Sequence, residues 1–234
     1  MEVLVKKLRE MFPTLLRYKE TERIVETFRR VIQNKGSSIL EVGCGYGVNL
    51  QALKKAGFSN LIGVDINKHI VDSVKSLGLE CIHAEDFDKS KQYDAILMSH
   101  IIEHFMPDDL LPFMDSYLDA LKPSGHLVIV TPLMWHGFYY DFDHVKSYSP
   151  RGLLYVFGIN NEQVQYYSRN KLIMEGLPYI GKTPYQIAWY KSFLLRSKNI
   201  FERAFQFVLN VLFFVSKGYI GQANWWMGVF KKIS

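Results

Sequence analysis

The segment Gly43-Cys44-Gly45-Tyr46-Gly47 places glycines at alternate positions, directly after the apolar run 39–42 and just before a helix-forming segment that begins at Val48. Glycine tolerates positive φ and lets the backbone approach a ligand closely. The first turn of the following helix offers unpaired N–H groups to an anion. The order of strand, tight loop and helix therefore predicts a ligand-binding loop at the carboxyl end of a buried strand.

The spacing of these glycines excludes two common loops. A dinucleotide fingerprint requires Gly-x-Gly-x-x-Gly, but the sixth position counted from Gly43 is Val48. No Gly-Lys-Ser or Gly-Lys-Thr follows either, as it would in the phosphate loop of nucleoside triphosphatases. NAD and nucleoside triphosphates are thus disfavoured.

Short apolar runs and helix-forming segments alternate along most of the chain. Strands are expected at 39–42, 61–65, 80–84, 93–99 and 126–131, and helices at 14–34, 48–55, 68–77, 108–121 and 150–157. Further strands are expected at 163–168 and 224–230. Alternation of this kind predicts a parallel sheet with crossover helices on both faces.

Two acids follow the glycine loop at strand ends. Asp65 lies eighteen residues after Gly47, close to the offset of about 20 residues at which an acid meets ribose hydroxyls. Asp86 ends the third strand, where its carboxylate could accept from an exocyclic amine while Phe87 packs on a ring. In this order, the two acids predict a ligand that carries adenosine.

The strand and loop motifs together resemble the class I S-adenosylmethionine-dependent methyltransferases. The motifs are Ile39-Leu40-Glu41-Val42-Gly43-Cys44-Gly45-Tyr46-Gly47, Val64-Asp65-Ile66, Ala84-Glu85-Asp86-Phe87, Tyr93-Asp94-Ala95-Ile96 and Leu121-Lys122-Pro123-Ser124-Gly125-His126-Leu127. The resemblance covers roughly 35–168 and the last ten residues. It implies a Rossmann-like, doubly wound α/β fold. Its seven-stranded sheet would be mostly parallel with an antiparallel last strand, and a helical insertion would precede that strand.

The same resemblance implies S-adenosyl-L-methionine as the cofactor and assigns residues to it. The glycine loop and Glu41 would hold the methionine end, Asp65 the ribose hydroxyls, and Asp86 with Phe87 the adenine. The full expected set is Glu41, Gly43, Cys44, Gly45, Gly47, Asp65, Ile66, Asp86, Phe87, Ser99 and His100.

Histidines follow the fourth strand in Ser99-His100-Ile101-Ile102-Glu103-His104. His-x-x-Glu-His is also the signature of inverted zinc peptidases, so a zinc-dependent hydrolase using His100 and His104 is the rival from another class. That motif needs a long helix and a third ligand, whereas here a strand precedes it and Pro107 follows closely. We therefore expect no metal. In the methyltransferases, a similar Glu-His pair lines the pocket near the methyl group.

An aromatic loop, 135–150, follows the fifth strand at the edge where ligands of such sheets bind. Its Asp-x-x-His before Tyr-Ser-Pro resembles methyltransferases of bacterial surface-polysaccharide and related glycan pathways, where it caps the active site. We hypothesise that His104 or His144 is a general base for the acceptor, oriented by Asp143 or Glu103. The alternative is that His144 only pins the loop through Asp141.

Charge separates the last quarter of the chain from the rest. Residues 1–168 hold 18 basic and 21 acidic side chains, whereas 169–234 hold 10 basic and 2 acidic ones. The apolar run 204–215 is shorter than the roughly 20 residues of a membrane span. It is expected to be a core helix, a dimer face or an interfacial helix. Its basic flanks are Lys191, Arg196, Lys198, Arg203 and Lys217.

These patterns predict a helical segment 1–34, a cofactor-binding core of 35–169 and 223–234, and a basic aromatic insertion 170–222. Cys44 and Cys81 lack a metal spacing, and the first seven residues lack the charged, apolar and small-residue order of a signal peptide, so none is expected. We expect a cytoplasmic protein, with peripheral contact to an anionic membrane through 191–217. The state of oligomerisation is not readable from the sequence.

The expected function is methyl transfer to oxygen of a sugar or glycan precursor, phosphorylated or lipid-linked. The alternatives are a quinone-type or other small-molecule acceptor, and a partner protein that binds S-adenosylmethionine without turnover. Nucleic acid is not expected as substrate, because no RNA-binding module is present and the site half of the chain is acidic on balance.

Overall fold

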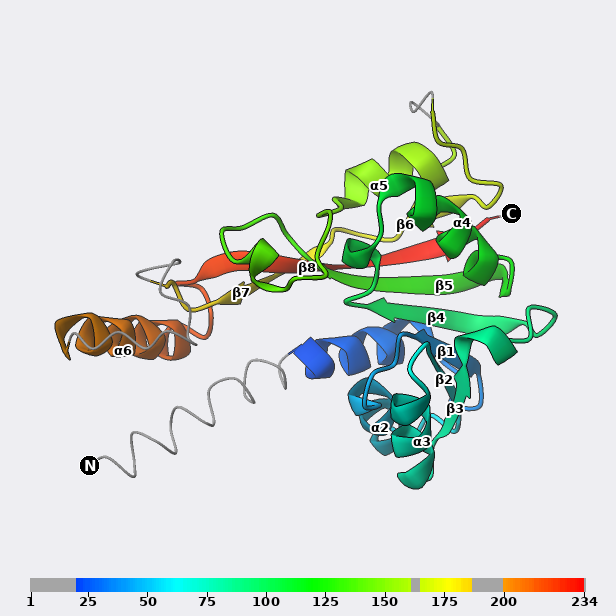
Figure 1. Cartoon of the computed structure of the whole chain (residues 1–234), viewed down its shortest axis with the longest axis horizontal. Helices are drawn as coiled ribbons and strands as arrows, with labels where there is room; N and C mark the ends of the chain where they lie inside the picture. The colour runs from blue at the N-terminus through cyan, green and yellow to red at the C-terminus, as the bar shows by residue number, and fades with distance from the viewer. Residues whose placement is uncertain (1–19, 161–164, 187–199, 234) are drawn as a thin grey trace.

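The computed structural model describes residues 20–160, 165–186 and 200–233. They form one twisted sheet with helices on both faces (Figure 1). The strands are β1 (Ser38–Val42), β2 (Asn60–Asp65), β3 (Glu80–His83), β4 (Tyr93–Ser99), β5 (Leu121–Pro132), β6 (Leu172–Met174), β7 (Tyr179–Thr183) and β8 (Gln222–Lys232). The helices are an N-terminal one, helical over 20–31, and α2 (Val48–Lys55), α3 (Lys68–Ser76), α4 (Pro107–Leu118), α5 (Pro150–Phe157) and α6 (Ile200–Val215).

The strand order is β3-β2-β1-β4-β5-β8-β6, and β7 also pairs with β8. Strands β1 to β5 are parallel and β8 is antiparallel to β5, which confirms the expected Rossmann-like sheet. Strand β1 has β2 on one side and β4 on the other, so the order in which strands are added to the sheet reverses at β1. Ligands of such sheets bind at the carboxyl ends of the strands beside this switch point.

The central strands are buried on both faces. Successive residues of β4 alternate between the two apolar layers, with Ile96 and Met98 in one and Ala95 and Leu97 in the other. The first layer packs under α4 and α5, and the second under α2, α3 and the N-terminal helix. In β8, Trp226 is fully buried in the first layer. The last strand is therefore part of the core rather than an edge.

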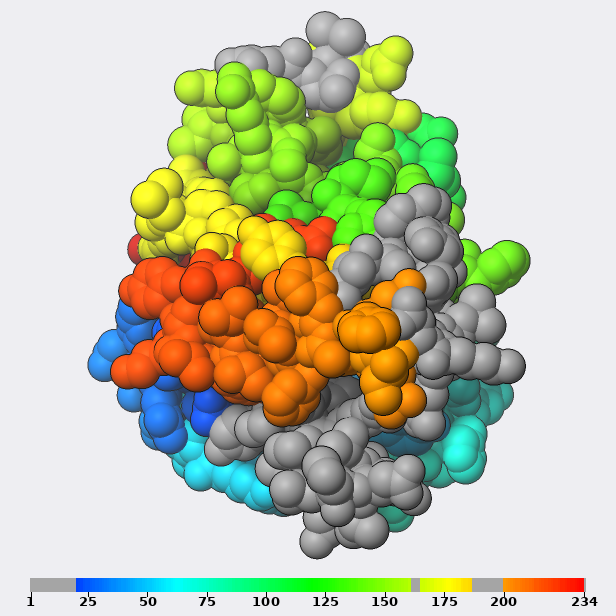
Figure 2. All heavy atoms as spheres, turned by 90° about the vertical axis from the view of Figure 1, so that its left-hand side faces the viewer, coloured from blue at the N-terminus to red at the C-terminus, as the bar shows by residue number. Residues whose placement is uncertain are grey.

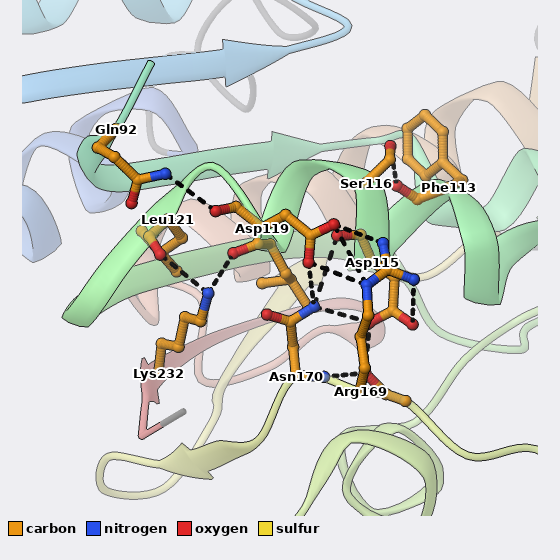
Figure 3. Close-up of polar contacts among 11 residues, drawn as sticks. Gln92, Phe113, Asp115, Ser116, Asp119, Leu121, Arg169, Asn170 and Lys232 are labelled. Carbon is orange, nitrogen blue, oxygen red and sulfur yellow. Dashed lines mark hydrogen bonds and ion pairs between the residues drawn. The ribbon is translucent and has the colours of Figure 1, made fainter. Parts of the chain in front are cut away.

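The edge strands differ from the expectation. The described residues 165–168 of the expected strand 163–168 have no strand structure, and the edge is formed instead by β6 and β7. Polar contacts with α4 explain the difference (Figure 3). Ser168 donates to Asp115, Arg169 pairs with Asp119, and the Asn170 amide donates to both carboxylates. Within the described part of the chain, residues 168–170 therefore bind side chains at the end of α4 and do not form backbone hydrogen bonds with a neighbouring strand.

The same network holds the end of β8. Lys232 Nζ donates to the carbonyls of Leu118 at 2.7 Å and Leu121 at 3.0 Å (Figure 3). These contacts lie at the amino ends of β4 and β5, because Leu121 begins β5 and pairs with Tyr93. Polar contacts thus hold the amino ends of these strands in place, and the candidate site lies at the carboxyl ends.

The segment 170–222 contributes β6 and β7 to the sheet as well as α6, so the edge of the sheet falls inside the expected insertion. Helix α6 projects from the body at the end of the β7–β8 pair (Figure 1). Of its side chains, only Phe213 is buried, which excludes the core-helix option. Within the described residues, every helix is too short or too polar to cross a bilayer.

Candidate active site

The glycine loop turns sharply between β1 and α2. Gly43, Gly45 and Gly47 all have positive φ, at 65°, 48° and 70°. The amide of Gly43 donates to the carbonyl of Val64 at 2.7 Å, which holds the loop against β2. A Cβ atom on Gly43 would lie 1.9 Å from Cδ1 of Ile101. The first glycine is therefore required both by its backbone angle and by the side chain packed against it.

Asp65 ends β2 directly beside this loop. Its Oδ2 accepts from the amide of Gly45 at 3.1 Å and its Oδ1 from the amide of Asn67 at 2.9 Å. The carboxylate is nearly buried, and each oxygen keeps a further lone pair. Asp65 can thus accept from the two hydroxyls of a ribose while its own position is fixed.

Glu41 lies at the carboxyl end of β1 and is buried. Its Oε1 accepts from the Asn49 amide at 2.8 Å, whereas Oε2 has no hydrogen-bond partner among the described residues. Burial raises the pKa of Glu41 to about 8, although hydrogen bonds from Asn49 and the Leu50 backbone oppose this. A buried carboxylate oxygen without a donor fits the ammonium group of a methionine moiety. Asn49 was not predicted, although it lies on the first turn after the loop.

The end of β3 holds Asp86 and Phe87, the two residues expected to bind adenine. Asp86 is exposed in the 3-10 turn η1 (Ala84–Asp86), whereas Phe87 is buried and packs against Tyr93 of β4 and Tyr117 of α4, with ring centroids 6.2 and 4.9 Å away. The structure thus places Phe87 in the core beside Asp86, and its contact with adenine stays a prediction.

Ile66, which follows Asp65 at the end of β2, has an exposed apolar side chain. It is 83% exposed, and its carbonyl accepts from Nε2 of His83 at 2.8 Å. His83 was not predicted, because its role depends on a contact between two strand ends. Cys44, also in the expected cofactor set, is buried, with its Sγ 3.5 Å from Sγ of Cys81.

His100 follows Ser99 at the end of β4 with a φ of 56°, which is uncommon for a residue other than glycine. Its Nδ1 lies 3.2 Å from Oε1 of Glu103, and its Nε2 lies 3.0 Å from Oε1 of Glu20. Burial lowers the pKa of His100, but the two carboxylates outweigh it and raise the pKa to about 10. His100 is thus an imidazolium at neutral pH, and it connects the N-terminal helix to the site.

Glu103 and two histidines form the centre of the site. Glu103 is fully buried, and its Oε2 accepts from the Thr131 hydroxyl at 2.9 Å. His104 Nδ1 donates to the carbonyl of Asp143 at 3.1 Å, and His144 Nδ1 donates to the carbonyl of Phe138 at 2.8 Å. Because a carbonyl can only accept, both Nδ1 atoms carry hydrogen. In the neutral rings, each Nε2 therefore has a free lone pair.

The aromatic loop is fastened to Glu103 through its backbone. The amides of Val145 and Lys146 donate to the Glu103 carbonyl at 2.9 and 3.2 Å. Nε2 of His144 lies 4.0 Å from Oε1 of Glu103 and 3.7 Å from Oδ2 of Asp141.

Asp143, which was predicted to orient a base, is exposed and contacts His104 only through its backbone carbonyl. The carboxylates near His144 are those of Glu103 and Asp141. Thr131 and Phe138 were not predicted either, because their contacts form only when β5 and the aromatic loop lie beside Glu103 and the histidines.

The side chains of Glu103, His104 and His144 could together hold a metal ion. One ligand atom each of Glu103, His104 and His144 lies within 4.8 Å of the other two. The third group, His144, comes from a loop forty residues away from His104, so local spacing could not reveal it. His100, which the zinc-peptidase pattern requires, is not in this group.

A family model described as a methyltransferase domain matches residues 12–173. The chain belongs to this family. The resemblance to class I S-adenosylmethionine-dependent methyltransferases is thereby confirmed, together with the α/β fold that it implied. The glycine loop and Asp65 lie at the switch point of the sheet, where open α/β sheets bind their ligands.

Similar proteins agree with this assignment. A ubiquinone biosynthesis O-methyltransferase from Bradyrhizobium diazoefficiens is 24% identical over 168 residues, which make up 66% of this methyltransferase and 65% of the relative. The match thus spans slightly less than two thirds of the relative's own length.

Two solved structures share the fold. A SAM-dependent methyltransferase from Archaeoglobus fulgidus has a TM-score of 0.51 and 19% identity, covering 90% of this chain and 94% of the other. The magnesium protoporphyrin IX methyltransferase from Synechocystis PCC 6803, with bound SAM, has a TM-score of 0.59 and 10% identity, covering 94% and 82%.

Proposed function

We propose that this methyltransferase transfers a methyl group from S-adenosylmethionine to a hydroxyl oxygen of a quinone-type small molecule. The observation that carries the proposal is the pair of histidines at the buried Glu103, next to the cofactor edge of the sheet, with both Nε2 atoms available. The curated relative is named for ubiquinone biosynthesis, which supports a quinone-type acceptor over the glycan acceptor expected from the loop.

The proposed mechanism needs alignment and one proton transfer. When bound, S-adenosylmethionine supplies a methyl group already activated by the sulfonium charge. Glu41 would hold the methionine part of the cofactor and Asp65 its ribose, at the same end of the sheet as the histidines. His144 or His104 then takes the proton of the acceptor hydroxyl on Nε2. The buried Glu103 carboxylate, held by Thr131, stabilises the resulting imidazolium.

Turnover with a panel of acceptors tests the proposal. The purified protein is incubated with S-adenosylmethionine and hydroxylated quinone precursors, sugars or sugar phosphates, and release of S-adenosylhomocysteine is measured. Release only with hydroxylated quinone precursors is the expected result. Release only with sugars would return the acceptor to the glycan class. Tight cofactor binding without release for any acceptor would favour the non-catalytic partner protein.

Cofactor binding is expected to release a proton from Glu41 below pH 8. Because its pKa is about 8 in the free protein, Glu41 is mostly protonated at pH 6.5 and must ionise to pair with the ammonium group. Affinity should therefore rise with pH, by up to about tenfold per pH unit, until Glu41 is ionised. Calorimetry at pH 6.5 in buffers of different ionisation enthalpy should show about one proton released per cofactor bound. The matched variant Glu41→Gln should show none, and equal release in both proteins would contradict this role.

Methyl transfer is expected to continue after removal of divalent cations. The His100 imidazolium lies 3.2 Å from Oε1 of Glu103. Its positive charge already balances the Glu103 carboxylate, so no metal ion is required for charge balance. Rates should be equal before and after dialysis against EDTA, with the metal content checked by mass spectrometry. A rate that is lost on dialysis and restored by one divalent cation would contradict this expectation and make Glu103, His104 and His144 the candidate ligands.

A further inference from the structure

Helix α6 has its apolar and polar faces reversed relative to a helix that packs on a protein core. Phe205, Val208, Leu212 and Val215, spaced three and four residues apart on one face, are 57%, 47%, 41% and 77% exposed. In an ordinary surface helix, such a stripe faces the core. Here it faces away from the body, and Figure 2 shows the helix lying across the face turned to the viewer.

The opposite face of α6 holds it to the protein. Gln206 donates to the carbonyl of Tyr185 at 2.8 Å and to Asn210 at 3.1 Å. Phe213, the buried residue of this helix, lies against Gly221, where a Cβ atom would come within 2.7 Å of its ring. Gln206, Asn210 and the buried Phe213 therefore lie on the face of α6 that contacts the protein, and the apolar stripe lies on the opposite face.

An outward stripe of this kind indicates an apolar partner, because soluble monomers rarely expose large contiguous apolar patches. We propose that α6 lies in the head-group region of an anionic membrane, with Phe205, Val208, Leu212 and Val215 inserted among the lipid chains. An amphipathic helix that lies in the plane of the membrane buries an apolar face in this way.

Charge selects the membrane over a second copy of the chain. Residues 182–217, which comprise α6 and its flanks, carry six basic side chains and one acidic side chain, Glu202. Arg203 and Lys217 lie at the two ends of α6 and are exposed. A face-to-face pair of copies would bring two such basic segments together, whereas anionic lipid head groups would neutralise them. Tyr219, 84% exposed just after the helix, is the type of residue that lies at a membrane–water interface.

The position of α6 also relates it to the site. Gln222, the first residue of β8 after the α6 turn, has its Nε2 3.2 Å from Nδ1 of His136. His136 belongs to the aromatic loop that carries His144. Contact through α6 would therefore bring the acceptor loop close to the lipid surface. This part of the inference rests on the proposed function, since it concerns delivery of an apolar acceptor.

Vesicle co-sedimentation tests the membrane contact without cofactor or acceptor. The full chain is mixed at low salt with vesicles of equimolar phosphatidylcholine and phosphatidylglycerol, or of phosphatidylcholine alone. We expect binding to the anionic vesicles that weakens at high salt. The double variant Val208→Glu with Val215→Glu should bind at least about tenfold more weakly, because two apolar side chains can no longer be buried. The matched control is Ile159→Glu with Leu177→Glu, which changes two exposed apolar residues away from α6 and should bind like the wild type.

Two kinds of outcome would overturn the membrane proposal, and a third would refute only the proposed function. Wild-type protein that stays in the supernatant at low salt, or an α6 variant that binds like the control, would exclude membrane contact. A concentration-dependent dimer in sedimentation velocity that the α6 variant abolishes, without vesicle binding, would assign the face to a second copy. Vesicle binding without S-adenosylhomocysteine release from any acceptor would instead refute the proposed function and leave the membrane contact intact.

Discussion

Replacing Asp65 with alanine is expected to weaken S-adenosylmethionine binding about a hundredfold. Two effects add. The variant loses the acceptor for two ribose hydroxyls, and it also loses the hydrogen bonds from the Gly45 and Asn67 amides that hold the loop in shape. Each hydrogen bond to a charged group contributes about 1.5–3 kcal/mol, so loss of one or two accounts for this factor. Isothermal titration calorimetry of the purified proteins measures it directly.

The comparison needs controls for folding and for general charge effects. Asp72→Ala on the exposed face of α3 removes an equal charge and should bind like the wild type. Asp65→Asn keeps one acceptor oxygen, and its cofactor affinity should lie between those of the wild type and Asp65→Ala. Circular dichroism should show the same α/β spectrum for all variants. Wild-type affinity in a folded Asp65→Ala protein would show that the loop binds its ligand in another way.

Loss of the catalytic base is the second large effect. We expect His144→Ala or His104→Ala to lower the methyl-transfer rate constant by about 10²–10⁴-fold, the range for general-base catalysis, with unchanged cofactor affinity. The His144 side chain is 13% exposed, and its Nε2 lies 4.0 Å from Oε1 of Glu103 and 3.7 Å from Oδ2 of Asp141. Single-turnover measurements of S-adenosylhomocysteine formation separate this step from product release.

A pH profile distinguishes a base from a residue that only pins the loop. Removal of the true base should abolish the acidic limb of the rate profile, whereas a structural variant should lower the rate at every pH. His126→Ala provides the matched control, because His126 pairs with Glu175 at 3.3 Å and lies outside the site. Wild-type rates in both His104→Ala and His144→Ala would exclude this assignment.

The sequence predicted most of the sheet and the glycine loop because both depend on local patterns. Strand β4 and helix α2 have the predicted bounds, since alternating apolar runs and the glycine turn specify them over a few residues. The position of Asp65 follows in the same way from the end of β2.

Contacts between distant segments were not predictable. The burial of Phe87 depends on Tyr117 from α4, and the position of His144 beside Glu103 depends on how a long loop folds back over a turn. The edge strands were misplaced because the acids of α4 bind residues 168–170 before the sheet resumes at β6. Each of these outcomes is decided by a partner that is remote in the sequence.

The order of the strands also bears on how the protein folds during synthesis. In the described sheet, β6 and β7 pair with β8 and precede it in the chain, while β8 alone connects them to β5. Both strands therefore emerge from the ribosome before their hydrogen-bonding partner exists, and the fully buried Trp226 arrives with that partner. The first five strands can assemble early, but their β5 border stays uncovered until β8 is translated. A chaperone that recognises unpaired strand edges would find this border available during that interval.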